Sequence, residues 1–142
     1  MTFNVQVTEV THKELVNLFS TAFYGNDLMS ADYDSNELNQ IPKDKLEGNC
    51  FEDKLADLLL NGKSIQIIDY EAEGEAYGDL PNHPSEYDRE VIIYDITLKD
   101  ILEGLSSEVN FQMMKEVQSG EGDMFTAYGL MQRIVFGEEI YG

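Results

Sequence analysis

The sequence predicts an α+β fold in which a small antiparallel sheet of about three strands carries helices mainly on one face. Two kinds of apolar spacing lead to this expectation: alternation typical of strands, and recurrence every three or four residues typical of helices. The 142 residues suit one domain with a substantial core, so residues 1–142 are expected to form a single acidic domain.

Three stretches have the pattern of β-strands. In the first, FNVQVTE, apolar and polar residues alternate, which predicts a half-buried strand at an edge of the sheet. The other two, SIQIIDYE and EVIIYDITL, are apolar on both faces, which is typical of central strands. They are expected to pair as a central hairpin, with Ile92, Tyr94 and Ile96 on a buried face. The predicted ranges are 3–9, 64–71 and 90–98.

Helical signals begin immediately after the first predicted strand. Thr11 followed by Glu14 is a capping box, and Gly25 supplies a stop. A second helix is expected at 50–61, with Asn49 as its cap and Gly62 as its end. Between these two helices, residues 26–49 are polar and irregular, and are expected to form a surface loop in which Pro42 precedes a short turn.

Part of this loop has the beginning of a calcium-binding pattern. Asp32, Asp34 and Asn36 occupy alternate positions, as carboxylates and amides do in an EF-hand loop. That loop requires Gly at its sixth place and Glu at its twelfth, where this chain has Glu37 and Lys43. No calcium site is therefore expected here.

Three further helices are expected in the C-terminal third. The first begins near Thr97, the second is capped by Ser107, and the third extends from Asp123 to a stop at Gly137. Apolar positions recur along the second at Val109, Met113, Met114 and Val117, and along the third at Met124, Ala127, Tyr128, Met131, Ile134 and Val135. This spacing favours a core role for Met113, Met114 and Met131 over an adaptable binding face.

The charge of the chain is its most unusual property. Its 28 acids and 9 Lys and Arg give a net charge of −19. A compact domain of this length has a radius of gyration of about 15 Å and spans roughly 37 Å. The same length of duplex DNA carries about 22 negative charges. The charge density is thus comparable with that of DNA, which argues against direct nucleic-acid binding and favours attraction to basic surfaces.

The acids concentrate in the connection between the two central strands, AEGEAYGDLPNHPSEYDR at 72–89. Eight acids lie from Asp69 to Glu90, and Arg89 is the only cation among them. Tyrosines between them can supply contact area at low entropic cost. Long connections are often functional, although a solvated loop without a role is the simpler interpretation. The predicted partner-binding residues are Glu71, Glu73, Glu75, Tyr77, Asp79, Glu86, Tyr87 and Asp88.

Catalytic patterns are not found. The chain has two histidines, and His12 is expected to be exposed in the first turn of a helix. His83 lies among acids and raises a metal-dependent enzyme as a third hypothesis, but its spacing fits no established metal site. Cys50 has no strong activator, and phosphate-binding glycine motifs are absent. The sequence therefore predicts a protein that is not an enzyme and needs no cofactor or metal.

The lone cysteine excludes an internal disulfide, and the chain has neither an 18-residue apolar run nor a signal-peptide pattern. Cytoplasmic location in a bacterial cell, with no membrane contact, is therefore expected.

In size, charge and organisation the chain resembles the small acidic inhibitors of host defence encoded by phages and mobile elements, namely anti-CRISPR and anti-restriction proteins of the DNA-mimic type. Its closing LMQRIVFGEEIYG is also similar to small proteins of bacterial mobile elements. The resemblance implies an α+β inhibitor whose carboxylates replace phosphates in the basic cleft of a CRISPR effector nuclease or restriction enzyme.

Two hypotheses remain open on the sequence. The first is the inhibitor just described. The alternative is an acidic, non-enzymatic adaptor or structural protein of a mobile element, which could form a homodimer through a methionine-bearing helix face.

Overall fold

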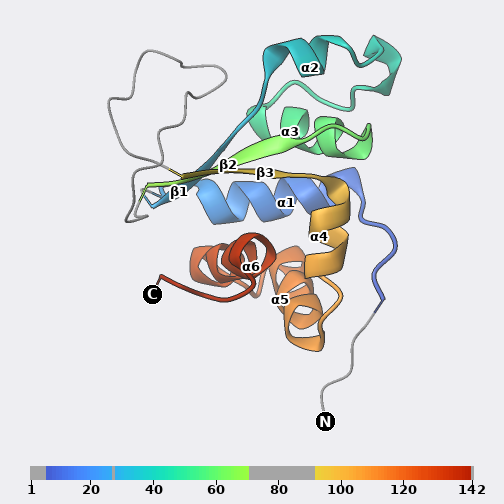
Figure 1. Ribbon diagram of the computed structural model, residues 1–142. Helices are drawn as coiled ribbons and strands as arrows, with labels where there is room; N and C mark the ends of the chain where they lie inside the picture. The colour runs from blue at the N-terminus through green and yellow to red at the C-terminus, as the bar shows by residue number, and fades with distance from the viewer. Residues whose placement is uncertain (1–5, 27, 71–91, 142) are drawn as a thin grey trace.

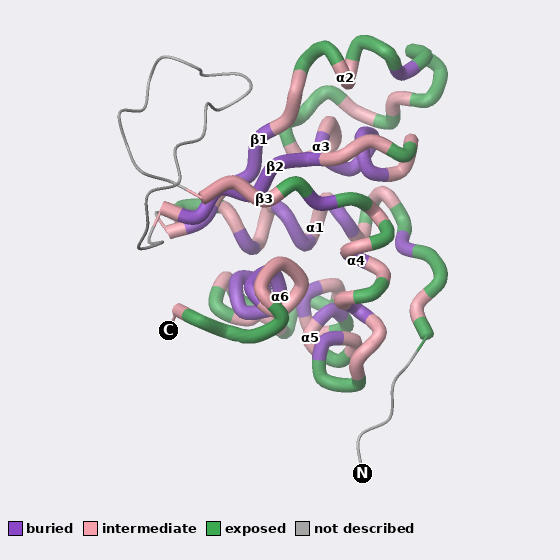
Figure 2. Tube along the Cα trace, in the orientation of Figure 1, coloured by how far each residue is buried: buried purple, intermediate pink, exposed green. Residues whose placement is uncertain are grey.

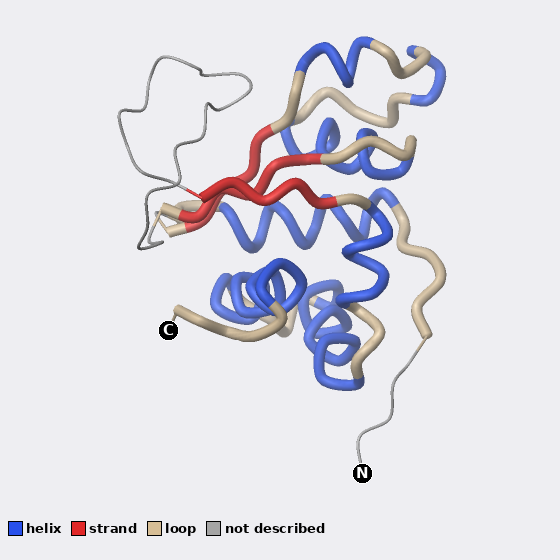
Figure 3. Tube along the Cα trace, viewed as in Figure 1, coloured by secondary structure: helices blue, strands red, loops and turns tan. Residues whose placement is uncertain are grey.

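The computed structural model describes residues 6–26, 28–70 and 92–141, and the α+β class is confirmed in this part of the chain. Three strands form one antiparallel sheet in the order β1-β2-β3 (Figures 1 and 3). The strands are β1 (Met29–Asp32), β2 (Ile65–Asp69) and β3 (Ile92–Ile96). The helices are α1 (His12–Phe23), α2 (Ser35–Asn39), α3 (Phe51–Leu60), α4 (Leu98–Gly104), α5 (Glu108–Ser119) and α6 (Met124–Phe136), with a 3-10 helix η1 (Lys43–Lys45).

The two strands predicted as a hairpin do pair with each other. Ile67 lies opposite Tyr94, and Ile65 lies opposite Ile96. Of the three residues predicted on a buried face of β3, Ile96 is buried, whereas Ile92 and Tyr94 are half-buried. Only β2 is central, however, because β3 has no second neighbour among the described strands. Within the described sheet, the prediction of a central place is confirmed for β2 alone, and the apolar residues of β3 pack into clusters on both faces of the sheet.

The strand predicted at the N-terminus is not found. Residues 6–9 form no strand, and residues 3–5 lie outside the described part. Val7 instead donates its backbone N–H to the Ser106 hydroxyl, at 3.2 Å, between α4 and α5. Val7 also packs against the core, so its apolar side chain is accommodated without a sheet.

The place beside β2 belongs to β1, which lies in the stretch predicted as a surface loop. Ala31 faces Ile67 across the strand pair, and Met29 is buried on the same face. The connection from α1 is fixed by Asn26, whose side-chain oxygen accepts from the backbone N–H groups of Leu28 and Met29.

The main core lies on one face of the sheet, as predicted. Ile65 and Ile67 are fully buried there with Leu15, Leu18 and Phe19 of α1. Figure 1 shows α1, α4, α5 and α6 on this side, while α2 lies on the other side. Helix α1 lies at the centre of the packed helices, because it contacts α3, α5 and α6. Figure 2 shows its buried residues.

The opposite face of the sheet is more polar. Ile68 is buried there with Tyr70 and Ile93 beside it. Gln66 donates a 2.8 Å hydrogen bond to the exposed Asp95 carboxylate across β2 and β3. This face therefore combines a small apolar cluster with polar cross-strand pairs.

The predicted helix signals are largely confirmed. Thr11 and Glu14 form the capping box of α1, and Ser107 and Asp123 cap α5 and α6. The cap of α3 is Cys50, one residue after the predicted Asn49. Gly25, Gly62 and Gly137 each have positive φ at a helix end, as predicted.

The methionines predicted as core lie inside. Met114 and Met131 are buried, and Met113 is half-buried against the core. Val109 was expected beside them but is half-exposed. Among the described residues, no helix is both long and apolar enough to cross a membrane.

Candidate functional site

All eight predicted partner-binding residues lie in 71–91, outside the described part of the chain. So does His83, and with it the alternative metal site. The structure describes the strand ends on either side of this acidic connection, Asp69 of β2 and Ile92 of β3, which we call its base. Asp69 at the end of β2 lies opposite Ile92 at the start of β3, so the two ends of the connection are held side by side.

The base is held by two long-range side-chain hydrogen bonds. The Tyr141 hydroxyl donates to the Asp69 carboxylate at 2.8 Å, and the Tyr70 and Ser30 hydroxyls are 2.7 Å apart. Burial, and then the nearby Asp69 carboxylate, raises the pKa of both Tyr141 and Tyr94. The raised pKa keeps the Tyr141 hydroxyl protonated, and so able to donate to Asp69, above the pH at which an ordinary tyrosine ionises.

A surface hollow of about 380 Å³ lies beside β3. Its carboxylates come from Asp95, Asp100 and Glu103, and no Lys or Arg of the described residues lines it. One of these carboxylates, Glu103, forms an exposed ion pair with Lys99 at 3.8 Å, which leaves Asp95 and Asp100 as the acids without a cation beside them among the described residues. The hollow therefore offers an acidic environment that suits a basic side chain. Its lining residues are Tyr94, Asp95, Ile96, Asp100, Glu103, Gly104, Ile134 and Val135.

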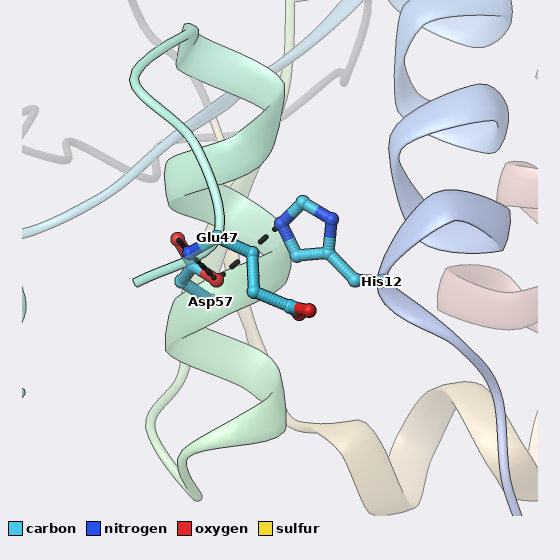
Figure 4. A group of neighbouring side chains, drawn as sticks. All are labelled: His12, Glu47 and Asp57. Carbon is cyan, nitrogen blue, oxygen red and sulfur yellow. Dashed lines mark hydrogen bonds and ion pairs between the residues drawn. The ribbon is translucent and has the colours of Figure 1, made fainter. Parts of the chain in front are cut away.

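A second cluster joins three parts of the chain that are far apart in sequence. His12 of α1 points toward Asp57 of α3 and the side chain of Glu47, which precedes α3 (Figure 4). Only 15% of the His12 side chain is exposed, so the prediction of an exposed histidine was wrong. The capped start of α1 directs His12 against α3 because α1 and α3 pack together.

The distances in this cluster are short. His12 Nε2 lies 3.3 Å from Asp57 Oδ1 and 3.5 Å from Asp53 Oδ1. The Asp57 carboxylate also accepts the backbone N–H of Glu47, at 3.2 and 3.1 Å from its two oxygens. Burial raises the pKa of the Asp57 carboxyl, while the Glu47 hydrogen bond and His12 oppose this shift. His12, Glu47 and Asp57 can offer one nitrogen and two oxygen ligands within 4.8 Å of one another.

A partial signal for this cluster was present in the sequence. Asp53 and Asp57 are four residues apart on the predicted helix 50–61, which places both carboxylates on one face. Their partner His12 is about forty positions away, and only the packing of α1 on α3 brings it near. Helical spacing could therefore identify the two acids, but not the histidine.

Several acids, among them Asp100 of the hollow, have structural roles. Glu14 and Asp100 complete the capping boxes of α1 and α4, and Asp34 and Asp123 cap α2 and α6. Acids near helix N-termini are favoured by the helix dipole. These acids cap helices, so part of the negative charge of the chain has a role in folding.

No family model matches the chain, and comparisons with curated proteins and with solved structures give no match. Function is therefore inferred from the residues of this chain alone.

Proposed function

We propose that the protein is a non-enzymatic inhibitor that binds the basic cleft of a nucleic-acid-processing defence enzyme, such as a CRISPR effector nuclease or a restriction enzyme. Its carboxylates would replace substrate phosphates, and it would act in the cytoplasm of a bacterial host. The observation that carries this proposal is the presence of eight acids and one cation between Asp69 and Glu90, within a chain of net charge −19.

The arrangement of the sheet supports this proposal. Because Asp69 and Ile92 are paired across β2 and β3, the acids between them belong to one connection that starts and ends at one place on the domain. The hollow at the α4 end of β3 adds three described carboxylates, those of Asp95, Asp100 and Glu103. A cluster of carboxylates on one side of a domain produces a collective field that attracts and orients a basic partner.

The methionine-mediated dimer is not favoured by the structure. Met114 is 6% exposed and Met131 is fully buried, so neither provides a binding surface. This bears only on a dimer formed through these two methionines, and the acidic, non-enzymatic adaptor remains the alternative to the inhibitor.

The test is inhibition of DNA cleavage by purified CRISPR effector nucleases and restriction enzymes. One variant neutralises Glu73, Glu75, Glu86 and Asp88 to their amides. A matched control neutralises the exposed Glu9, Glu108, Glu121 and Glu138, so both variants change the net charge from −19 to −15. Any inhibition, and DNA displacement from the enzyme, should weaken by at least about tenfold in the first variant and far less in the control.

Each single amide substitution should have little effect, because an exposed ion pair contributes only about 0–1 kcal/mol. Inhibition should also weaken between 50 and 300 mM NaCl, since salt screens the field over distances of about 10 Å. An equal loss of inhibition in both variants would show that inhibition depends on the total charge of the chain and not on the acids of the connection. Absence of inhibition across the panel, with no enzyme captured from a defence-competent lysate at low salt, would reject the proposal.

A further inference from the structure

We propose that His12, Glu47 and Asp57 form a binding site for a divalent transition-metal ion, with Zn²⁺ the best fit. This site is separate from the proposed acidic interface and does not depend on it. The residues come from the start of α1, the segment before α3, and α3 itself (Figure 4).

The spacing fits a tetrahedral ion. Two ligands bound to zinc at about 2.0–2.1 Å lie about 3.3–3.4 Å apart in such a site. His12 Nε2 and Asp57 Oδ1 are 3.3 Å apart, so an ion between them needs almost no movement of either side chain. The Glu47 side chain is exposed and has a carboxylate oxygen within 4.8 Å of the other two ligand atoms. A modest rotamer change would bring it to the ion, leaving the fourth position for water.

The surroundings of His12 Nε2 are the second line of evidence for a metal site. Nε2 has essentially no exposed surface and forms no hydrogen bond with a described residue, although two carboxylate oxygens lie within 3.5 Å. A buried polar atom without a hydrogen bond is costly. A charged imidazole offsets part of this cost through its ion pairs with Asp57 and Asp53. An ion between Nε2 and Asp57 Oδ1 would instead use the lone pair of the neutral imidazole.

The ligands are also held in place. Asp57 is 1% exposed, and both of its oxygens accept the Glu47 backbone N–H, which fixes the carboxylate and ties the Glu47 segment to α3. Asp53 adds a further carboxylate 3.5 Å from His12 and is itself fixed by the backbone N–H of Cys50. Hydrogen bonds of this kind orient metal ligands and strengthen binding.

The donor set determines the class of ion. Imidazole suits Zn²⁺ and its first-row neighbours, whereas Mg²⁺ and Ca²⁺ prefer ligand sets made only of oxygen. We therefore expect Zn²⁺ and Co²⁺ to bind in the presence of excess Mg²⁺. Non-specific attraction of cations to the acidic surface would not show this preference.

The experiment is calorimetric titration of the full, chelator-treated chain with ZnCl₂ in 150 mM NaCl and excess MgCl₂. A single equivalent should bind, and the melting temperature should rise with Zn²⁺. His12→Ala should weaken binding by at least about tenfold, and so should Glu47→Gln, which changes an exposed side chain and should fold normally. His83→Ala changes the other histidine of the chain and should stay within about twofold of the parent.

Co²⁺ provides a spectroscopic check. The parent should give the visible absorption of tetrahedral Co²⁺, and Cys50→Ser should leave the spectrum unchanged because no thiolate is proposed as a ligand. Zinc binding that is equal in the parent, the His12→Ala variant and the Glu47→Gln variant would overturn the proposal. So would the absence of saturable binding, which would leave His12 and Asp57 as an ion pair only.

Discussion

The hydroxyl of Tyr141 donates a 2.8 Å hydrogen bond to the carboxylate of Asp69, joining the segment after α6 to the end of the central strand. Asp69 is buried, so its carboxylate oxygens need hydrogen-bond donors. Gln132 holds the same segment, because its side-chain oxygen accepts the backbone N–H groups of Ile140 and Tyr141. The last residues described are therefore part of the packed structure at the base of the acidic connection.

This hydrogen bond predicts a stability effect above pH 10. Burial and Asp69 raise the pKa of Tyr141 above its ordinary value of 10.0, so the folded chain retains this proton after the unfolded chain has lost it. Stability from Tyr141 is therefore complete below pH 10 and is lost as pH rises further, by up to about 1.4 kcal/mol per pH unit. Tyr141→Phe should show a smaller loss of unfolding free energy than the parent from pH 10 to 11, measured by urea denaturation.

At pH 7 the same variant should be less stable by about 1–3 kcal/mol, because the nearly buried Asp69 loses a donor. Tyr24 is 87% exposed, and Tyr24→Phe is the matched control that should follow the parent at both pH values. A Tyr141→Phe profile parallel to that of the parent above pH 10 would contradict the assigned role.

The burial of Ile67 in the central strand predicts a large loss of unfolding free energy when its side chain is shortened. Ile67 of β2 is fully buried between its strand neighbours Ala31 and Tyr94 and the core. Ile67→Ala should lower the unfolding free energy by about 2–5 kcal/mol, because it removes buried apolar surface and leaves a cavity. Val109 is half-exposed, so Val109→Ala should cost well under half as much in the same urea titration. Similar losses in the two variants would argue against the assignment of β2 to the core.

The net charge predicts that salt stabilises the fold. Repulsion among the acids opposes the compact state, and the Debye length shortens from about 30 Å at 0.01 M to about 8 Å at 0.15 M ionic strength. The melting temperature should therefore rise between 10 and 150 mM NaCl. The variant with four acids neutralised in 73–88 should start higher and rise less. A melting temperature that falls with added NaCl would mean that attractive ion pairs outweigh the repulsion.

Local signals in the sequence predicted most helices and the pairing of β2 with β3. Capping residues such as Thr11, Ser107 and Asp123 act within one turn of helix, so their effect is visible in a short stretch of sequence. The alternation in β3 was similarly clear, because a buried face requires an apolar residue at every second position.

The position of β1 could not be predicted in the same way. Met29–Asp32 contains Ser, Ala and Asp, which have low strand propensity, and it becomes a strand because β2 supplies its hydrogen-bond partners. The opposite error concerned Val7. The alternation around it predicted a strand, but its backbone N–H donates to the Ser106 hydroxyl.

The two candidate sites also differ in whether the sequence alone reveals them. The density of acids from Asp69 to Glu90 is a property of composition and is visible in the sequence. The cluster of His12 with Asp57 depends on how α1 packs on α3, a contact that no local pattern specifies.

The pairing of Asp69 with Ile92 separates two kinds of evolutionary constraint. Residues of β2 and β3 must preserve the core, whereas insertions in the connection between them leave the strand register unchanged. Doubling a flexible loop costs only about 0.6 kcal/mol of additional closure entropy. A longer connection within 71–91 is therefore expected to leave the pairing of β2 with β3 intact. Such a division suits a protein whose partner changes under selection, because new surfaces can be tried on a fold that stays intact.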